Sequence, residues 1–216
     1  MIDLHTHTIF SDGELIPAEL TRRAAVAGYR AIGLTDHGDM SNMDLIIPRL
    51  VRVAEDLSQA WGLTVVPGIE LTHIPPAAIA EAAREARKLG AKLVVCHGET
   101  LSEPVAEGTN RAALEADIDI LAHPGLISEE EVRLAAERGI CLELTTRSGH
   151  SLSNGHVARA ALVGGARLVL NTDSHAPGDL TPLEKARRIA FGAGLSEAQF
   201  EQCRRNSEEL VKRLMG

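Results

Sequence analysis

The chain begins MIDLHTHTIFSDG (residues 1–13), and this stretch decides how the rest is interpreted. A short β-rich run ends in His5 and His7, and Asp12 follows five residues later. Alternate side chains of a strand share one face, so the two imidazoles are expected side by side at the carboxyl end of a first strand. The question is whether later strands end in the same way.

The chain continues as an alternation of short β-rich runs and longer amphipathic stretches. Several of the helical stretches end at a glycine, as helices with a left-handed C-cap do (Gly28, Gly90 and Gly139). Ser128 and Glu131 fit a capping box at the start of another helix. Strands are expected over 1–7, 31–37, 63–70, 91–97, 118–123, 140–146 and 167–175, with two further helices over 182–194 and 196–216.

Strands that alternate with helices of this length predict βα units and a parallel sheet. An open dinucleotide-binding sheet should carry G-x-G-x-x-G after its first strand, and that motif is absent. We therefore expect an α/β fold, a distorted seven-stranded TIM-like (β/α) barrel with extra C-terminal helices. The length of 216 residues fits one domain over 1–216.

Composition excludes several functional classes. Hydrophobic residues make up 44% of the chain and charged residues 24%, as in ordinary globular domains. The net charge of −8 disfavours extended nucleic acid, whose phosphates need a basic face. Three cysteines without motif spacing indicate a reducing compartment. No apolar run reaches the ~20 residues of a membrane span, and Asp3 and His5 do not fit a signal peptide, so we expect a cytoplasmic protein without a membrane partner.

Histidines and carboxylates recur where the predicted strands end. In a parallel barrel the carboxyl ends of the strands form one ring. A lone histidine at a strand end is most often structural, but this repetition indicates a metal centre. One ion takes three or four ligands, so this number of candidates predicts two or three ions, with Zn²⁺, Mn²⁺ and Fe²⁺ left open. The candidates are His5, His7, Asp12, His37, Glu70, His97, His123, Asp173 and His175.

Six motifs, in this order and spacing, resemble those of the PHP family, named for polymerase and histidinol phosphatase. They are DLHTHTIFSDG (3–13), LTDHG (34–38), GIE (68–70), CHG (96–98), AHPG (122–125) and NTDSH (171–175). The resemblance implies a distorted seven-stranded barrel, in agreement with the strand pattern. It also implies metal-dependent hydrolysis of phosphate esters, either monoesters such as histidinol phosphate or diesters in 5′-3′ exonucleases.

The resemblance further implies three ions. Such a centre would hydrolyse the ester through a hydroxide that bridges two of them. The first ion would bind His5, His7, Glu70 and Asp173, the second Glu70, His97 and His123, and the third Asp12, His37 and His175.

The segment TTRSGHSLSNGH (145–156) supplies two candidate catalytic residues outside the ligand set. Arg147 would bind phosphate bidentately, and His150 would protonate the leaving group. The alternatives are a surface salt bridge for the arginine and a solvated loop position for the histidine. Glu99 is expected to orient a ligand, and Arg111 either to bind an anion or to form a salt bridge; His73 is left outside the metal set.

The compact chain favours a phosphatase, histidinol-phosphatase-like, that acts on a small phosphorylated molecule. One alternative is a phosphodiesterase or 5′-3′ exonuclease acting on a nucleotide or short nucleic acid. A second is an amidohydrolase-type barrel, which expects a lysine after strand four and an eighth strand. A third is a metal-bound module without catalytic activity, which should have lost some of the ligands.

Overall fold

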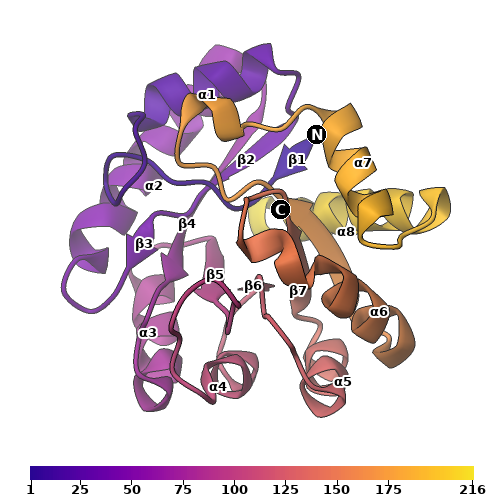
Figure 1. The fold of residues 1–216 in the computed structure, drawn as a ribbon. Coiled ribbons are helices and arrows are strands. Elements are labelled where there is room, and N and C mark those ends of the chain that lie inside the picture. Colours follow the sequence, from indigo (N-terminus) through magenta and orange to yellow (C-terminus); the bar gives the residue numbers. More distant parts are fainter.

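The computed structural model describes residues 1–216, and its parallel strands follow the predicted alternation (Figure 1). Seven strands lie in the order β1-β2-β4-β5-β6-β7-β8, and every pairing is parallel. Their bounds are β1 (Ile2–Asp3), β2 (Ala31–Leu34), β4 (Thr64–Leu71), β5 (Leu93–His97), β6 (Ile120–Ala122), β7 (Cys141–Thr145) and β8 (Arg167–Asn171).

The short strand β3 (His37–Gly38) does not add an eighth strand to the barrel. It pairs with β4 in the register that β2 already uses, since Leu34 faces Pro67 and His37 faces Glu70. The chain therefore leaves the sheet only at Thr35 and Asp36 and then resumes the same path. Even there Thr35 N–H donates to Thr6 O and Glu70 N–H donates to Asp36 O, so the predicted strand over 31–37 is present with a short irregular break.

The first and last strands nearly close the barrel just beyond their ends. Thr6 and Ser174 form an isolated parallel bridge, and His7 N–H donates to Ser174 O at 2.8 Å. Asp173 N–H donates to His5 O at 2.9 Å. The expected seven-stranded, TIM-like barrel is confirmed, and its closure places His5 and His7 beside Asp173.

Helices surround the strands as an outer ring (Figure 1). Gly28, Gly90 and Gly139 have positive φ, as expected of residues that end helices, and Ser128 forms the predicted capping box with Glu131. None of the helices is long and apolar enough to cross a membrane. The helices are α1 (Pro17–Val26), α2 (Met43–Trp61), α3 (Pro76–Lys88), α4 (Thr109–Glu115), α5 (Glu129–Arg138), η1 (His150–Ser153), α6 (Asn154–Gly164), η2 (Pro177–Asp179), α7 (Leu183–Gly192) and α8 (Glu197–Met215).

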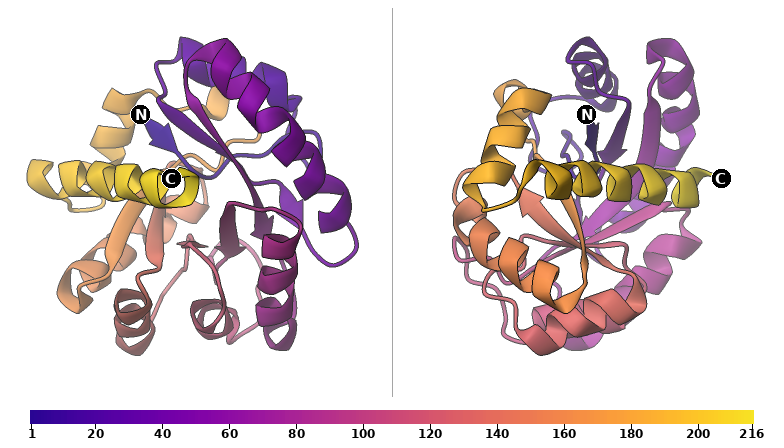
Figure 2. Two further views of the ribbon diagram at one scale, coloured as in Figure 1. Left: turned by 180° about the vertical axis from the view of Figure 1, so that it is seen from behind. Right: turned by 90° about the vertical axis from the view of Figure 1, so that its right-hand side faces the viewer.

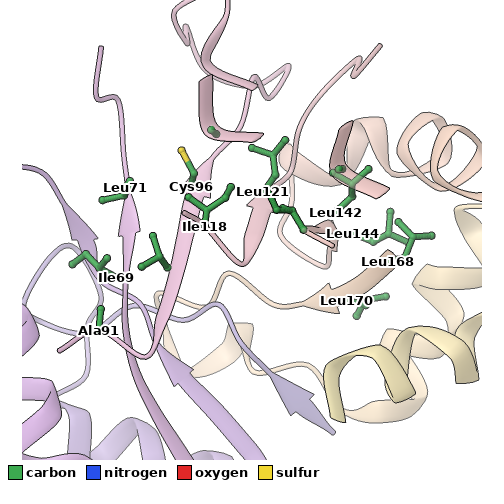
Figure 3. Close-up of a cluster of buried hydrophobic side chains, with 14 of the residues drawn as sticks. Ile69, Leu71, Ala91, Cys96, Ile118, Leu121, Leu142, Leu144, Leu168 and Leu170 are labelled. Carbon is green, nitrogen blue, oxygen red and sulfur yellow. The ribbon is translucent and has the colours of Figure 1, made fainter. Parts of the chain in front are cut away.

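The hydrophobic core has two parts, one on each side of the strands. A cluster of 43 buried residues lies largely between the strands and the surrounding helices, and Figure 3 shows part of it, including Leu121, Leu142 and Leu144. A second cluster of 9 buried residues fills the barrel interior and includes Leu210 of α8. Figure 2 shows α8 lying across the end of the barrel opposite the view of Figure 1.

The interior changes from apolar to polar along each strand, and this gradient positions the site. In β4 the same face carries Val66 near the start and Glu70 near the end. In β5 that face carries Leu93 and Val95 and then His97. Apolar side chains therefore fill the amino-terminal half of the barrel, while ionisable side chains collect at the carboxyl ends of the strands.

Candidate metal centre

A polar pocket of about 420 Å³ opens at the carboxyl ends of the strands. None of its lining residues is hydrophobic. The lining includes both candidate catalytic residues, Arg147 and His150, together with six of the predicted ligands: Asp12, His37, His97, His123, Asp173 and His175. The three remaining predicted ligands, His5, His7 and Glu70, are buried beneath the pocket.

Distances between the donor atoms show whether these side chains could share ions. Two ligands bound to one ion at about 2.1 Å lie roughly 3.0–3.4 Å apart in octahedral or tetrahedral geometry. His5 Nε2 lies 3.2 Å from Glu70 Oε1, and His7 Nε2 lies 3.1 Å from Asp173 Oδ1. These separations match ligand pairs around a common ion. The structure thus brings together the group predicted for the first ion.

The group predicted for the third ion is also assembled. Asp12 Oδ1 lies 3.1 Å from His175 Nε2 and 3.4 Å from His37 Nε2, and the two imidazole nitrogens are 3.4 Å apart. The His7 ring stacks on that of His175 with a centroid distance of 4.0 Å. His7 therefore lies between the first and third groups, within reach of both.

The second group differs from the predicted one in its third member. His97 and His123 lie together with centroids 4.6 Å apart, as predicted. Their nitrogens form a compact group with His150, whose ring stacks on His123 at 4.2 Å. Glu70 is farther away, with Oε1 3.8 Å from His123 Nε2. His150 is thus placed among the predicted ligands rather than in a solvated loop.

Unpaired buried atoms test whether this set of residues fits metal ions. Six buried side-chain nitrogen or oxygen atoms lack a hydrogen-bond partner. Five of them belong to the predicted ligands: His5 Nε2, both ring nitrogens of His7, Glu70 Oε1 and His123 Nδ1. A buried polar atom without a partner costs about 1–3 kcal/mol, so such a concentration calls for a missing ligand. Divalent ions bound to one nitrogen of each imidazole and to Glu70 Oε1 would remove most of this cost.

Neighbouring polar groups hold the rings of three histidines so that Nε2 faces the centre. His5 Nδ1 lies 2.9 Å from the buried Glu143 carboxylate. His37 Nδ1 lies 2.7 Å from Thr72 Oγ1, and His97 Nδ1 donates to Gly98 O at 3.0 Å. Metal-binding histidines commonly have their second nitrogen fixed in this way. The arrangement leaves one ring nitrogen of each residue free for an ion.

Burial and neighbouring charges shift the pKa values of the predicted ligands. Burial lowers the pKa of His7 to about 3, which keeps this imidazole neutral. Burial also opposes protonation of His37, but the nearby Glu70 and Asp12 carboxylates raise its pKa to about 10. Burial would raise the pKa of Glu70, yet His5 and His37 hold it well below its usual range. The carboxylates thus remain ionised and available to cations.

Backbone strain is concentrated at the same place. Only three residues other than glycine have positive φ: His73 (52°), His123 (29°) and Asp173 (53°). Left-handed backbone is costly for such residues and is found most often at functional sites. Two of the three are predicted ligands, and the third lies at the pocket mouth. The left-handed backbone at these three residues directs their side chains into the pocket.

Arg147 is the only arginine or lysine in the pocket lining. Its Nη1 donates to the main-chain oxygen of Asp173 at 3.1 Å, and its Nε lies 3.6 Å from the Asp173 carboxylate. The guanidinium is about one-third exposed. It thus stands beside the predicted metal ligands with part of its donor edge still accessible from the pocket.

The structure overturns the expectation for Glu99 and decides between the two alternatives for Arg111. Glu99 orients no predicted ligand, because its carboxylate accepts a hydrogen bond from Asn110 N at 2.9 Å and ties the chain to α4. Arg111 pairs with Glu115 and Glu130 on the surface and does not line the pocket, so the salt-bridge alternative holds. Both residues stabilise the segment around α4.

Sequence reasoning missed Glu143, Glu103 and the placement of His73. Glu143 could have been found, since it is the only charged residue in the apolar run ICLEL (140–144). Glu103 lies in an irregular loop, and its position near His97 has no signal in the sequence. His73 was left outside the metal set, but its Nε2 lies 3.3 Å from Glu103 and its ring lies 4.8 Å from that of His97.

Comparison with known proteins finds relatives that span nearly the whole chain. An uncharacterized protein of Methanocaldococcus jannaschii, MJ1295, is 48% identical over 98% of this chain and 99% of its own length. A probable phosphatase of Proteus mirabilis, PMI1003, is 27% identical over 93% of this chain and 87% of its own.

The fold is shared with a solved structure as well. Histidinol phosphate phosphatase from Lactococcus lactis, crystallised with zinc, L-histidinol and phosphate, superimposes with a TM-score of 0.64. It is 19% identical, and the match covers 90% of this chain and 94% of that one. The family model described as the PHP domain matches residues 3–167. This chain belongs to the PHP domain family.

Proposed function

We propose that this protein is a metal-dependent phosphatase that hydrolyses a small phosphate monoester. The observation that carries the proposal is the assembly of compact groups of histidines and carboxylates around one pocket, with unpaired buried polar atoms and one arginine beside them. The kinship with proteins named as phosphatases supports the same reaction class.

The nine predicted ligands would hold two or three divalent ions, with Glu70 at the centre of the set. Its two carboxylate oxygens face His5 and His123 on one side and His7 and His37 on the other. Bound there, Zn²⁺, Mn²⁺ or Fe²⁺ would lower the pKa of water and neutralise charge on the phosphate oxygens. The donor set contains nitrogen and oxygen but no sulfur, and it suits all three metals.

Arg147 and His150 would act on the substrate directly. The Arg147 guanidinium can donate two parallel hydrogen bonds to phosphate oxygens at the edge of the metal groups. Thr100 Oγ1 and Ser102 Oγ lie 2.7 and 3.0 Å from His150 Nδ1 and fix the ring, so that Nε2 faces the pocket. From there His150 can deliver a proton to the leaving alkoxide, provided that it is not itself bound to an ion.

The pocket favours a small hydrophilic substrate over a nucleic acid. Its lining contains no Phe, Tyr, Trp or aliphatic side chain on which a nucleobase could stack, and Arg147 is its only arginine or lysine for contacts with a phosphate backbone. An amidohydrolase reaction is less well supported, because β5 ends in His97 and the lining contains no lysine. All nine candidate ligands are present, which favours an active enzyme over a module without activity.

The test is turnover by protein stripped of metal and then loaded with Mn²⁺ or Zn²⁺. We expect hydrolysis of p-nitrophenyl phosphate to exceed that of bis-p-nitrophenyl phosphate, and to vanish in a His5→Ala/His7→Ala variant. His156→Ala is the matched control, because this histidine donates to Ile127 O outside the pocket. Preferred cleavage of the diester would overturn the monoester assignment, and bound ions without turnover of either ester would count against an enzyme of this class.

A further inference from the structure

Glu103 is a carboxylate at the pocket mouth that the predicted ligand set does not include. It lies in the loop between β5 and α4, which is called the mouth loop here (residues 98–108). Three imidazole nitrogens surround its carboxylate: His97 Nε2 at 3.1 Å, His73 Nε2 at 3.3 Å and His150 Nε2 at 3.4 Å. These histidines come from three different loops or strand ends.

These distances are those of ligands that share an ion. Donor atoms around one ion are separated by roughly 3.0–3.4 Å, the range found between donor pairs of the first and third groups. His97 Nδ1 donates to Gly98 O, so the neutral ring carries its lone pair on Nε2. That lone pair faces the Glu103 carboxylate at 3.1 Å, which is repulsive unless a proton or a cation lies between them.

His97 cannot serve two ions through its single free nitrogen. It nevertheless belongs to two compact groups, one with His123 and His150 inside the pocket and one with His73 and Glu103 at the mouth. One ion at His97 Nε2 can therefore receive ligands from both sides. Glu103 at the mouth then supplies the carboxylate that the group of His97, His123 and His150 lacks.

The mouth loop is also fixed relative to the inner group. Thr100 and Ser102 contact His150 Nδ1 through their hydroxyls, and Gly98 N–H donates to Ala122 O beside His123. Glu103 follows Ser102 directly, so its approach to the histidines is set by a loop that is tied down at both of them. The carboxylate remains 39% exposed, which leaves it free to move into solvent.

We propose that Glu103 is a displaceable ligand of the ion held by His97, occupying the position that the substrate phosphate takes over. The inference rests on the metal centre of the proposed function. In the absence of substrate, the Glu103 carboxylate, with His73 beside it, would complete the coordination of this ion. An incoming phosphate dianion would replace one anionic oxygen ligand by another, and the displaced Glu103 side chain would turn into solvent.

The experiment compares wild-type protein with Glu103→Gln and with Glu107→Gln as the matched control. Glu107 lies exposed in the same loop, so its substitution changes the loop charge equally and touches no histidine. Zn²⁺ is titrated into metal-stripped protein by calorimetry, and the visible absorption of the Co²⁺-loaded protein reports the coordination. Inorganic phosphate serves as the probe for displacement.

We expect Glu103→Gln to weaken one ion's affinity at least about tenfold, the loss already seen for residues that touch a ligand only indirectly. It should change the Co²⁺ spectrum and tighten phosphate binding, while Glu107→Gln matches wild type in all three measurements. Unchanged affinity and spectrum in Glu103→Gln would overturn the proposal even if the enzyme turns over normally. Wild-type protein that binds the ions but hydrolyses no ester would instead remove the proposed function and leave the role of Glu103 standing.

Discussion

The buried Glu143 carboxylate offers the sharpest test of how the barrel holds its first ion. Its two oxygens lie 2.9 and 3.2 Å from His5 Nδ1, and both side chains are fully buried. Asn171 Nδ2 donates to Glu143 Oε1 at 2.8 Å, and Asn171 Oδ1 accepts from Leu4 N–H at 2.9 Å. Glu143 is thus a positioning residue, fixed by the strand ends, that acts on an ion through His5.

Glu143→Gln keeps the shape and one hydrogen-bond acceptor but removes the charge. An ion on His5 Nε2 would lie about 7 Å from this carboxylate, and at an effective dielectric constant of about 20 each unit of ionic charge contributes roughly 2 kcal/mol. Asp173 neutralises one unit of a divalent ion's charge, and Glu70 is shared among the groups, so up to about one unit of charge remains uncompensated. The expected loss is about 2 kcal/mol, or roughly thirtyfold in affinity, within the range known for such indirect partners.

The assay is competition for Zn²⁺ between the protein and a chromophoric chelator, with circular dichroism of the metal-free variant to confirm the fold. Glu137→Gln, an exposed position on α5, controls for the change in net charge. Affinity within threefold of wild type in a folded Glu143→Gln protein would refute the reasoning. It would mean that the first ion does not sit on His5, or that the carboxylate merely fills a polar cavity.

Three further predictions concern stability and turnover. Each ion present at 1,000 times its dissociation constant should add about 4 kcal/mol and raise Tm by roughly 8–16 °C in calorimetry. Arg147→Lys should lower kcat/KM about tenfold while mass spectrometry finds the metal content unchanged, because the bidentate phosphate contact is lost. Burial raises the pKa of Cys141 to about 11 and of Cys203 to about 12, so between about pH 9 and pH 11 these thiols ionise mainly in the unfolded chain. The free energy of unfolding of metal-free protein, measured in urea, should therefore fall above pH 9, by at most about 1.4 kcal/mol per pH unit for each thiol.

Each of these predictions has an opposing outcome. Identical Tm values with and without chelator would mean that the ions do not bind the folded state selectively. Arg147→Lys with full activity would place the arginine in a structural role beside Asp173. Cys203→Ala should remove one thiol's contribution to the fall in unfolding free energy above pH 9. An unchanged pH dependence would show that other groups control it.

The sequence by itself determined the barrel and most of the candidate site. Alternating βα units can bury their apolar faces only by stacking as parallel strands, and parallel strands end at one edge. Residues at strand ends, such as His97 and Asp173, were therefore expected to lie together before any coordinates were known. The helix caps at Ser128 and Gly139 were readable for a similar reason, because capping is decided by a few neighbouring residues.

Only the tertiary structure decided how those residues are grouped and what supports them. In the second group, His150 lies with His97 and His123, and Glu70 is farther away. Contacts between the mouth loop and the segment from β7 to α6 place the His150 ring there. Glu103 and His73 approach His97 through irregular loops, whose paths depend on contacts far apart in the sequence. Local residue patterns indicate where a strand lies, although β1 and β8 end earlier than expected, at Asp3 and Asn171. A loop's course is set by long-range contacts, and so the pocket mouth could be described only once the chain was folded.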